Sequence, residues 1–284
     1  MKKRICVIGA GYWGKNHIKT LNELGCLYGI VEMNANLQEL NQKQYPNSKI
    51  FSDLPQALLD NDIDGFILAT PAHTHYSLAK EVIEKNKPIL VYFHGNSFDI
   101  GERSHRLKRY NDAGFSSLIV AWRGYSGNDG IPTERNLYAD GDSTIQWILE
   151  NTDFNVEDII NYGESLGTGV AVELNLKYDF LCTVLEAPFT SIADVALKRY
   201  KIFPTKLLVR DKFDNFKKID QIKSPLLVIS GKKDEIVPHE HSVLLIRRAL
   251  EPKKALFIDE AMHNNLYDFR IEKTVINFSL NIWK

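Results

Sequence analysis

The sequence predicts an α/β protein in which a mostly parallel sheet lies between two layers of helices, a three-layer doubly wound arrangement. Three observations lead to this prediction. Short apolar runs rich in Val, Ile and Leu recur along the 284 residues, stretches with apolar residues three or four apart separate most of them, and no repeat period interrupts the alternation. Parallel strands have this continuous apolar character because helices cover both faces of their sheet.

The expected elements follow in chain order. The apolar runs expected as strands are residues 4–10, 27–33, 65–70, 88–93, 117–122, 159–163, 182–187, 225–230 and 255–259. The clearest helical stretches are residues 17–24, 54–61, 76–86, 142–151, 170–177 and 242–250. The longest stretch without a clear strand is 189–222. In a sheet enzyme, a long connection of this kind is the expected place for a cap over the site.

Composition excludes several classes of protein. The 35 basic residues balance 36 acidic ones, so the formal net charge is −1 and no excess of positive charge indicates nucleic acid or an anionic membrane as a partner. Cys6, Cys26 and Cys182 are too few and too scattered for a disulfide framework or a zinc site. The first apolar run is too short for a signal peptide or a membrane span. We therefore expect a cytoplasmic protein with a small-molecule substrate, and leave its oligomeric state open.

A glycine motif follows the first expected strand. Gly9, Gly11 and Gly14 form GxGxxG between this strand and a helix, where they permit a tight turn, the approach of a pyrophosphate and close packing of helix on strand. Glu32 ends the second strand, where a carboxylate for ribose hydroxyls is expected. These residues indicate a dinucleotide site. The alternative is that the glycines serve only a tight turn.

Residues 1–91 resemble the NAD-binding domain of the glucose–fructose oxidoreductase/inositol dehydrogenase (Gfo/Idh/MocA) family, on the stretches KRICVIGAGYWGKNHIKTLNELG and IDGFILATPAHTHYSLAKEVIEKNKPILV. The resemblance implies that Thr70, Pro71 and His75 form the loop on the nicotinamide side of a bound NAD. That family continues with Glu-Lys-Pro, whose lysine acts at the reacting hydroxyl. Here Tyr92 follows Val91 instead, and no large substrate domain is present. We therefore expect that NAD can bind without a dehydrogenase site.

A second motif indicates an activated serine. Ser165 is the centre of GxSxG between an expected strand and a helix, the sharp turn that raises a serine hydroxyl above a sheet. A serine needs a base to take its proton and an acid to orient the base. Asp234 follows the strand at 225–230 and His263 follows the strand at 255–259, in the chain order acid then histidine. The alternative is a serine in an ordinary turn with surface Asp and His residues.

The oxyanion formed by attack on a carbonyl needs two backbone donors already in place. One is expected from the amide of Leu166, directly after the serine. The other is expected from the amide of Asn96, because His94-Gly95-Asn96 leaves the carboxyl end of the strand at 88–93.

Other polar residues are interpreted as structural. Asp211 and Asp214 are weaker candidates than Asp234 for the orienting acid, because neither directly follows a strand. Glu164, inside the serine motif, is interpreted as a structural or surface residue rather than a general base. No metal site is expected, because the paired histidines lie two apart in loops without an acid at helical spacing. These histidines are His73, His75, His239 and His241.

Residues 90–284 resemble the serine α/β-hydrolases of the abhydrolase-domain type, which include depalmitoylase-like thioesterases. The stretches YFHGN, WRGYSGNDGIPTERNLYADG, GESLGTGVAVELN, SGKKDEIVP and AMHNNL carry the resemblance. It implies Ser165, Asp234 and His263 as the triad of a serine esterase or thioesterase that needs no cofactor. The leading strands of that family are absent. We expect a Rossmann-like half at 1–91 and a hydrolase half at 92–284, with the cap near 189–222.

The two resemblances give the strand at 88–93 different neighbours in the sheet. The nucleotide-domain pattern places it beside 65–70, whereas the hydrolase pattern places it between 117–122 and 159–163, and a strand has only two edges. We expect the strand at 65–70 to pair with 117–122 instead, so that the halves form one continuous sheet. The alternative is two separate domains in which 117–122 is an unprotected edge.

The sequence thus predicts a hydrolase of an ester or thioester, with a nucleotide half that can bind NAD. One alternative is an NAD(P)-dependent oxidoreductase or NAD-binding module that lacks complete catalytic machinery. Another is an inactive interaction protein, in which the altered front displaces Asn96 and disrupts the oxyanion site.

Overall fold

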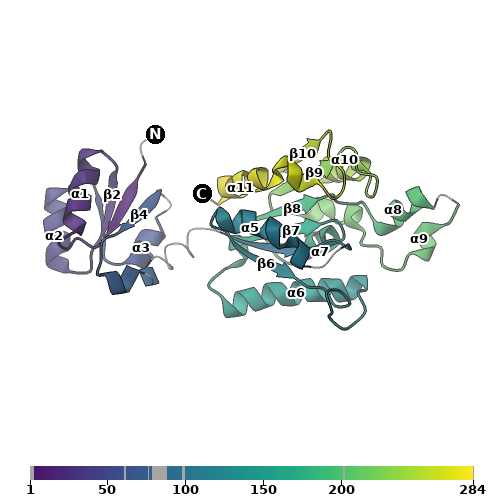
Figure 1. The fold of residues 1–284 in the computed structure, drawn as a ribbon, viewed down its shortest axis with the longest axis horizontal. Helices are drawn as coiled ribbons and strands as arrows, with labels where there is room; N and C mark the ends of the chain where they lie inside the picture. Colours follow the sequence, from purple (N-terminus) through teal and green to yellow (C-terminus); the bar gives the residue numbers. More distant parts are fainter. Residues whose placement is uncertain are drawn as a thin grey trace. The chain divides into compact units, whose positions relative to one another are not determined.

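A computed structural model describes residues 3–60, 62–75, 77–78, 88–97, 100–200 and 202–283. The chain divides into two compact units, 1–86 and 87–284, drawn in purple to blue and in teal to yellow in Figure 1. The boundary precedes the strand at 88–93, so this strand belongs to the second unit. The helix expected at 76–86 lies largely outside the described residues.

The first unit is a small doubly wound sheet. Its elements are β1 Ile5–Ile8, α1 Gly14–Glu23, β2 Leu27–Val31, α2 Ala35–Gln44, β3 Lys49–Phe51, α3 Leu54–Leu58 and β4 Gly65–Leu68. The strands are parallel in the order β3-β2-β1-β4. Successive β1 residues point to opposite faces: Cys6 packs with Leu54 and Ala57 of α3, whereas Val7 packs with Ile18 of α1. The three-residue β3 was not predicted, because it is too short to show a pattern.

The second unit contains a larger sheet of six parallel strands. These are β5 Ile89–Phe93, β6 Ser116–Val120, β7 Ile159–Glu164, β8 Cys182–Glu186, β9 Leu226–Gly231 and β10 Lys253–Ile258, in the order β10-β9-β8-β7-β5-β6. Its helices are α5 Ser104–Asp112, α6 Glu134–Asn151, α7 Gly167–Leu174, α8 Ile192–Arg199, α9 Thr205–Leu208, α10 His239–Arg248 and α11 Ile271–Ile282. The α/β fold class with doubly wound parallel sheets is confirmed.

Two apolar layers hold these helices on the six-stranded sheet. Val91 and Phe93 face a layer completed by α6, α7 and α10, whereas Leu90 and Tyr92 face a layer completed by α5 and α11. All four side chains are fully buried, so β5 is a central strand covered on both faces. In α6, a Cβ at Gly141 would lie 2.6 Å from Val170 of α7. Glycine therefore lets these two helices approach closely.

The expected continuous sheet is wrong. β4 pairs with β1, both edges of β5 are occupied by β6 and β7, and the described strands form two sheets. The outer edge of β6 has no partner among these strands. Ser116 and Ser117 begin β6, and both are only half-buried. A short edge strand that begins with polar residues tolerates an exposed edge. The expectation that β6 needs β4 as a partner therefore had no physical basis.

The connection from β8 to β9 contains no strand among its described residues and carries α8 and α9. Across the described part of the chain, no helix is both long enough and apolar enough to span a bilayer.

Candidate active site

Ser165 lies on a sharp turn between β7 and α7. Its φ of +48° is in the left-handed region, which costs a residue other than glycine roughly 1–3 kcal/mol. The Ser165 amide donates a hydrogen bond to the Glu186 carbonyl at 2.8 Å. This turn, called the elbow below, is therefore fixed to the end of β8. Its strained backbone directs the serine side chain outward at the carboxyl edge of the sheet.

Two glycines allow this turn. A Cβ at Gly163 would lie 2.7 Å from the carbonyl oxygen of Gly167, and a Cβ at Gly167 would lie 1.9 Å from that of Phe93. Both positions exclude a side chain, so the GxSxG spacing has a steric cause. The elbow backbone consequently packs directly against the end of β5.

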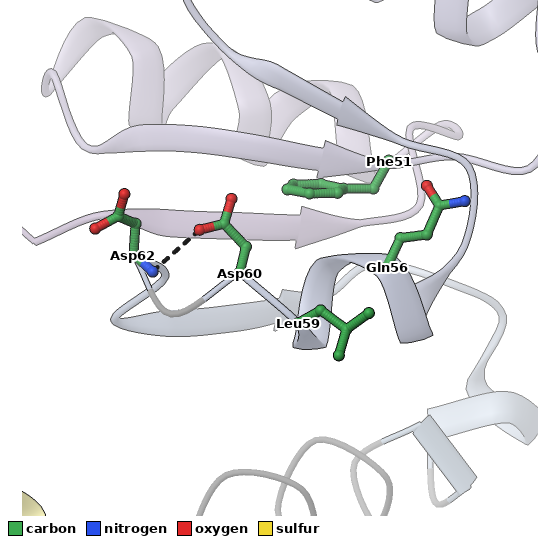
Figure 2. A pocket seen from close by; sticks show the side chains of 5 residues that line it. All are labelled: Phe51, Gln56, Leu59, Asp60 and Asp62. Carbon is green, nitrogen blue, oxygen red and sulfur yellow. Dashed lines mark hydrogen bonds between the residues drawn. The ribbon is translucent and has the colours of Figure 1, made fainter. Parts of the chain in front are cut away.

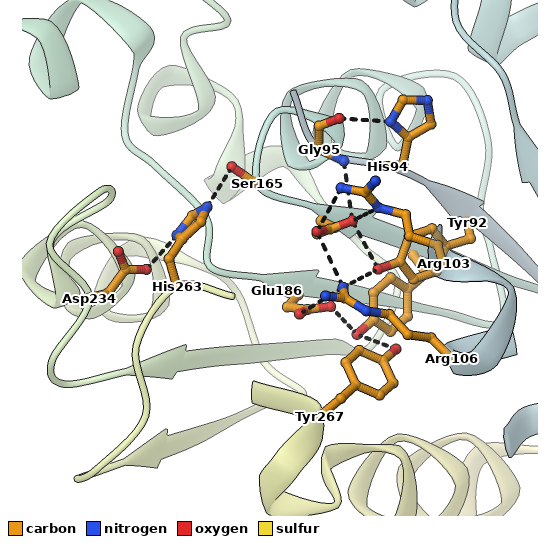
Figure 3. A network of polar contacts seen from close by, with 12 residues as sticks. Tyr92, His94, Gly95, Arg103, Arg106, Ser165, Glu186, Asp234, His263 and Tyr267 are labelled. Carbon is orange, nitrogen blue, oxygen red and sulfur yellow. Dashed lines mark hydrogen bonds and ion pairs between the residues drawn. The ribbon is translucent and has the colours of Figure 1, made fainter. Parts of the chain in front are cut away.

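Ser165, His263 and Asp234 come together at this edge (Figure 3). The His263 Nε2 atom lies 3.0 Å from Ser165 Oγ, and Nδ1 lies 2.6 Å from Asp234 Oδ2. The other Asp234 oxygen accepts hydrogen bonds from the amides of Ile236 and Val237 at 2.9 and 2.8 Å. The buried carboxylate is therefore held in place by its own loop, and His263 is positioned to exchange a proton with the serine hydroxyl.

The weaker acid candidates are engaged elsewhere. Asp211 accepts a hydrogen bond from the Glu134 amide at 2.8 Å, and Asp214 accepts one from the Lys217 amide at 3.3 Å. Neither contacts His263 through a described hydrogen bond, whereas Asp234 does.

The loop after β5 lies beside the serine. A Cβ at Gly95 would lie 3.2 Å from the Ser165 Cβ, so the Gly95 backbone packs against the nucleophile. The Asn96 side chain accepts a hydrogen bond from the Tyr125 hydroxyl. Leu166 directly precedes α7. The structure thus brings both segments with expected oxyanion donors to the elbow, and the roles of the Asn96 and Leu166 amides remain predictions.

The glycine motif of the first unit forms a compact turn at the end of β1. Gly9 has a φ of +93°, and a Cβ at Gly14 would lie 1.9 Å from the Gly9 carbonyl oxygen. At Gly11, by contrast, no described heavy atom lies within 4 Å of the place that a Cβ would take. The turn is therefore closed where helix meets strand and open at the position where a pyrophosphate would approach, which fits a dinucleotide.

The remaining cofactor candidates gather around this turn. Glu32 accepts hydrogen bonds from the amides of Ala10 and Asn34 at 2.8 and 2.9 Å, so its carboxylate is anchored beside the glycine loop. The Thr70 Cγ2 atom lies 3.0 Å from the position of a Gly9 Cβ. Pro71 follows it, and His75 Nε2 lies 2.7 Å from the Thr70 carbonyl oxygen. The structure thus brings the ends of β1, β2 and β4 together.

Comparison with known proteins gives two kinds of match. Residues 3–91 match the model of the family described as "Oxidoreductase family, NAD-binding Rossmann fold". An uncharacterised protein of Mycobacterium tuberculosis is 34% identical over 186 residues, which are 65% of this chain and 66% of that protein. The human alpha/beta hydrolase domain-containing protein 17B is also 34% identical over 186 residues, 63% of this chain and 62% of that protein. The chain thus spans less than two thirds of each relative.

A solved structure gives the fold of the second unit. The monoacylglycerol lipase of Paleococcus ferrophilus superposes with a TM-score of 0.52 at 20% identity, over 69% of this chain and 96% of that one. The second unit has the α/β-hydrolase fold. The predicted resemblances, to the Gfo/Idh/MocA family at the amino-terminal end and to the α/β-hydrolases over most of the remainder, are both confirmed.

Behind the turn that carries Ser165, the second unit contains a buried ion-pair network that sequence reasoning missed (Figure 3). Glu164 Oε2 lies 2.6 Å from Arg103 Nε, and Glu164 Oε1 lies 3.1 Å from Arg103 Nη2 and 3.2 Å from Arg106 Nη1. The same carboxylate accepts hydrogen bonds from the Tyr92 hydroxyl at 3.0 Å and from the Gly95 amide at 3.2 Å. One side chain therefore connects the turn that carries Ser165 with the loop after β5.

A second carboxyl completes the network. Glu186, at the end of β8, accepts a hydrogen bond from the Tyr162 hydroxyl at 2.7 Å and lies 3.6 Å from Arg106. Burial raises the pKa of Glu186 to about 7, and the charge of Arg106 only partly opposes this. Burial also acts to raise the pKa of Glu164, but its hydrogen bond to Arg103 and the charges of both arginines outweigh burial and lower it. The two carboxyls are therefore shifted in opposite directions.

The sequence did carry a signal for this network. β7 and β8 each end in a glutamate, and the two arginines lie three apart near the start of the helix after β5. Residues three apart on a helix share a face, and the carboxyl ends of parallel strands share an edge. The glutamates were therefore candidates for pairing with Arg103 and Arg106.

A separate hollow of about 470 Å³ lies in the first unit (Figure 2). It is lined by Phe51, Gln56, Leu59, Asp60 and Asp62. Asp60 accepts a hydrogen bond from Lys49 Nζ at 2.6 Å. The hollow shares no lining residue with the glycine loop or with the Ser165 site, so we assign it no part in either.

Proposed function

We propose that the protein is a serine hydrolase that cleaves an ester or thioester through an acyl-enzyme. The hydrogen-bonded series from Ser165 through His263 to Asp234, with distances of 3.0 and 2.6 Å, carries this proposal. The α/β-hydrolase fold supports it, because in that fold the same three residue types occur in this chain order.

The mechanism follows from the geometry. Ser165 Oγ attacks the substrate carbonyl carbon while His263 Nε2 takes the hydroxyl proton, and the amides of Leu166 and Asn96 stabilise the resulting oxyanion. When the intermediate collapses, the bond to the leaving oxygen or sulfur breaks and His263 returns the proton to that atom. Water then attacks the acyl-enzyme with His263 again as the base, which releases the acid and restores Ser165. Asp234 accepts the Nδ1–H hydrogen bond of His263 and orients the imidazole.

A fluorophosphonate probe tests the nucleophile in the full chain. We expect labelling of the wild type and none of Ser165→Ala, with a loss of roughly 10⁴ to 10⁶ in turnover of a soluble acyl ester or thioester. Ser143→Ala, at an exposed position of α6, is the matched control and should be labelled normally. An unlabelled wild type, or equal labelling of Ser165→Ala, would refute the proposal.

We also propose that the first unit binds NAD. The glycine turn favours this proposal, because it is open at Gly11 while Gly14 packs tightly against Gly9. The match to the NAD-binding family model supports it. Gly11 and the α1 amino terminus would hold the pyrophosphate, and Glu32 would hold the ribose hydroxyls. NAD, when bound, supplies hydride-transfer chemistry. The described residues offer no lysine at the position where that family continues from Val91, so we propose binding alone.

Calorimetric titration with NAD⁺ and NADH tests this second proposal. We expect measurable binding by the wild type and none by Gly11→Val, whose side chain would occupy the open space. Heat at the dilution level for the wild type would refute the proposal and leave the hydrolase proposal untouched.

A further inference from the structure

Exposed apolar side chains concentrate in one short stretch of the hydrolase unit. Six of the twenty large apolar residues that are exposed in the described part of the chain lie within residues 197–208. They are Leu197, Tyr200, Ile202, Phe203, Leu207 and Leu208. Ile202 and Leu207 are the most exposed of the six, at 89% and 84%. A cluster of this kind indicates an interaction surface rather than ordinary scattered exposure.

The segment that carries this cluster, residues 192–212, is described except for residue 201, and its described parts are joined by hydrogen bonds. Ser191 caps α8 by accepting a hydrogen bond from the Asp194 amide at 3.0 Å, and the buried Thr205 hydroxyl donates one to the Ala193 carbonyl at 2.9 Å. At the base, the Ile192 amide donates a hydrogen bond to the Lys212 carbonyl at 2.8 Å. α8 and α9 thus stand out from the edge of the sheet as a closed excursion (Figure 1). Six of its apolar side chains are exposed although hydrogen bonds hold its two ends and its two helices together.

The charge of the segment differs from that of the chain. Residues 192–212 contain six basic residues and two acidic ones, a net charge of +4, whereas the whole chain has −1. The basic residues are Lys198, Arg199, Lys201, Lys206, Arg210 and Lys212. The ion pairs of Lys198 with Glu240 and of Lys206 with Asp194 are long, at 3.6 and 3.5 Å, and the lysines in them are largely exposed. Such pairs contribute little and leave the lysines available to a partner.

We propose that this segment, through its described residues 192–200 and 202–212, docks on the surface of an anionic lipid bilayer. Protruding apolar side chains can enter the boundary between headgroups and acyl chains, and basic residues beside them are attracted to anionic headgroups by about 1 kcal/mol each. A protein partner would need a complementary apolar surface. A bilayer needs only this combination of protruding apolar and basic residues, so the segment favours the bilayer.

The docking surface lies at the edge that carries the candidate active site. The segment follows β8, and Ile131, Ile236 and Met262 are also exposed on loops that follow β6, β9 and β10. In a parallel sheet these loops all leave from the carboxyl edge, where Ser165 lies. Docking would therefore present the site to lipid-borne acyl substrates. This last consequence rests on the proposed hydrolysis, whereas docking itself does not.

Vesicle co-sedimentation of the full chain tests the docking. We expect the wild type to bind phosphatidylcholine vesicles that contain phosphatidylserine, and to bind less as salt is added. Ile202→Ser with Leu207→Ser should reduce partitioning roughly tenfold or more, because two protruding side chains lose their apolar contact. Lys198→Glu with Lys206→Glu should remove the preference for anionic vesicles.

Matched controls make the result decisive. Leu24→Ser with Leu59→Ser changes two exposed leucines of the first unit and should leave vesicle binding unchanged. Ser165→Ala should bind vesicles like the wild type, which separates docking from hydrolysis. A wild type that does not bind, or an Ile202/Leu207 variant that binds equally well, overturns the proposal. Light scattering gives a further test. If the wild type does not bind vesicles but is a dimer, and the Ile202/Leu207 variant is a monomer, the surface joins two copies and the proposal is overturned.

Discussion

Glu164 joins two pieces of backbone that the proposed reaction needs. It immediately precedes Ser165, and its carboxylate accepts a hydrogen bond from the Gly95 amide in the loop that carries Asn96. Arg103 and Arg106 balance its charge within a buried environment. An ion pair of this kind adds little to stability compared with apolar packing, but removal of one partner is costly. We therefore interpret Glu164 as a positioning residue.

Glu164→Gln should lower kcat by up to roughly 10² with little change in KM. The neutral amide removes the charge that Glu164 presents to Arg103 and Arg106 and loosens the Gly95 anchor, which weakens a donor that acts on the transition state. Steady-state kinetics on a soluble ester measure the effect. A variant with higher KM and unchanged kcat would show that the network serves substrate binding instead. Glu157→Gln, at an exposed position of the same unit, is the control.

The two network carboxyls should also give opposite pH dependences of stability. Because burial raises the pKa of Glu186 from 4.5 to about 7, the folded protein keeps a proton that the unfolded chain releases. This stabilisation is present below pH 4.5 and is lost as the pH rises through about 7. Glu186→Gln should therefore flatten the fall in the free energy of unfolding across this window, as measured by urea unfolding at a series of pH values.

The opposite sign applies to Glu164. Its pKa is lowered in the folded protein, so its contribution is present above its ordinary pKa of 4.5 and is lost on acidification. Glu164→Gln should flatten the acid side of the same stability profile. Identical profiles for the two variants would contradict the assignment of opposite shifts.

At the scale of elements, the elbow depends on contact between β5 and the start of α7. A methyl group at Gly167 would lie 1.9 Å from the Phe93 carbonyl oxygen, and backbone cannot yield as a flexible side chain can. Gly167→Ala should therefore cost roughly 1–3 kcal/mol or more in the free energy of unfolding and should abolish fluorophosphonate labelling. Denaturant unfolding measures the cost. Gly11→Ala, in open space, should be neutral, and an equal loss for both variants would reject the steric explanation.

The sequence was informative where local patterns decide structure. The apolar runs predicted the strands around Ser165, Asp234 and His263, and the parallel topology then brought these residues to one edge. It was uninformative where the choice between partners is tertiary. The resemblances to both families placed the strand at 88–93 in their own sheet. Only its pairing with β6 and β7 showed that it belongs to the sheet of the second unit. The glutamates and arginines of the Glu164 network were visible as candidates, but their pairing is also tertiary, because Glu164 and Arg103 are 61 residues apart.

At the scale of the whole molecule, the described strands form two separate sheets with separate apolar cores. Every described hydrogen-bond partner of Ser165, His263 and Asp234 lies in residues 87–284. Averages over the whole chain therefore conceal local properties. The net charge of −1 gave no reason to expect a membrane surface, whereas residues 192–212 alone have a net charge of +4.

Gly14→Ala should damage the first unit selectively. Its methyl group would lie 1.9 Å from the Gly9 carbonyl oxygen, which disrupts the junction of β1 and α1 and should abolish NAD binding. Labelling of Ser165 should persist, because none of its described partners is in the first unit. Fluorophosphonate labelling combined with limited proteolysis measures both properties in one sample. Loss of labelling together with NAD binding would show that the two units depend on each other.

Among the described strands, the outer edge of β6 has no partner, and this has a practical consequence for engineering. In the order of the sheet, the strands that position the site are β10, β9, β8, β7 and β5, and β6 lies beyond them. The outer edge of β6 is therefore one strand away from the site. An added strand could pair there without entering the layers that hold Ser165, in the manner of strand addition to exposed sheet edges. This edge is therefore a natural attachment point for a complementary peptide tag, through which the hydrolase unit could be immobilised or recruited to other proteins.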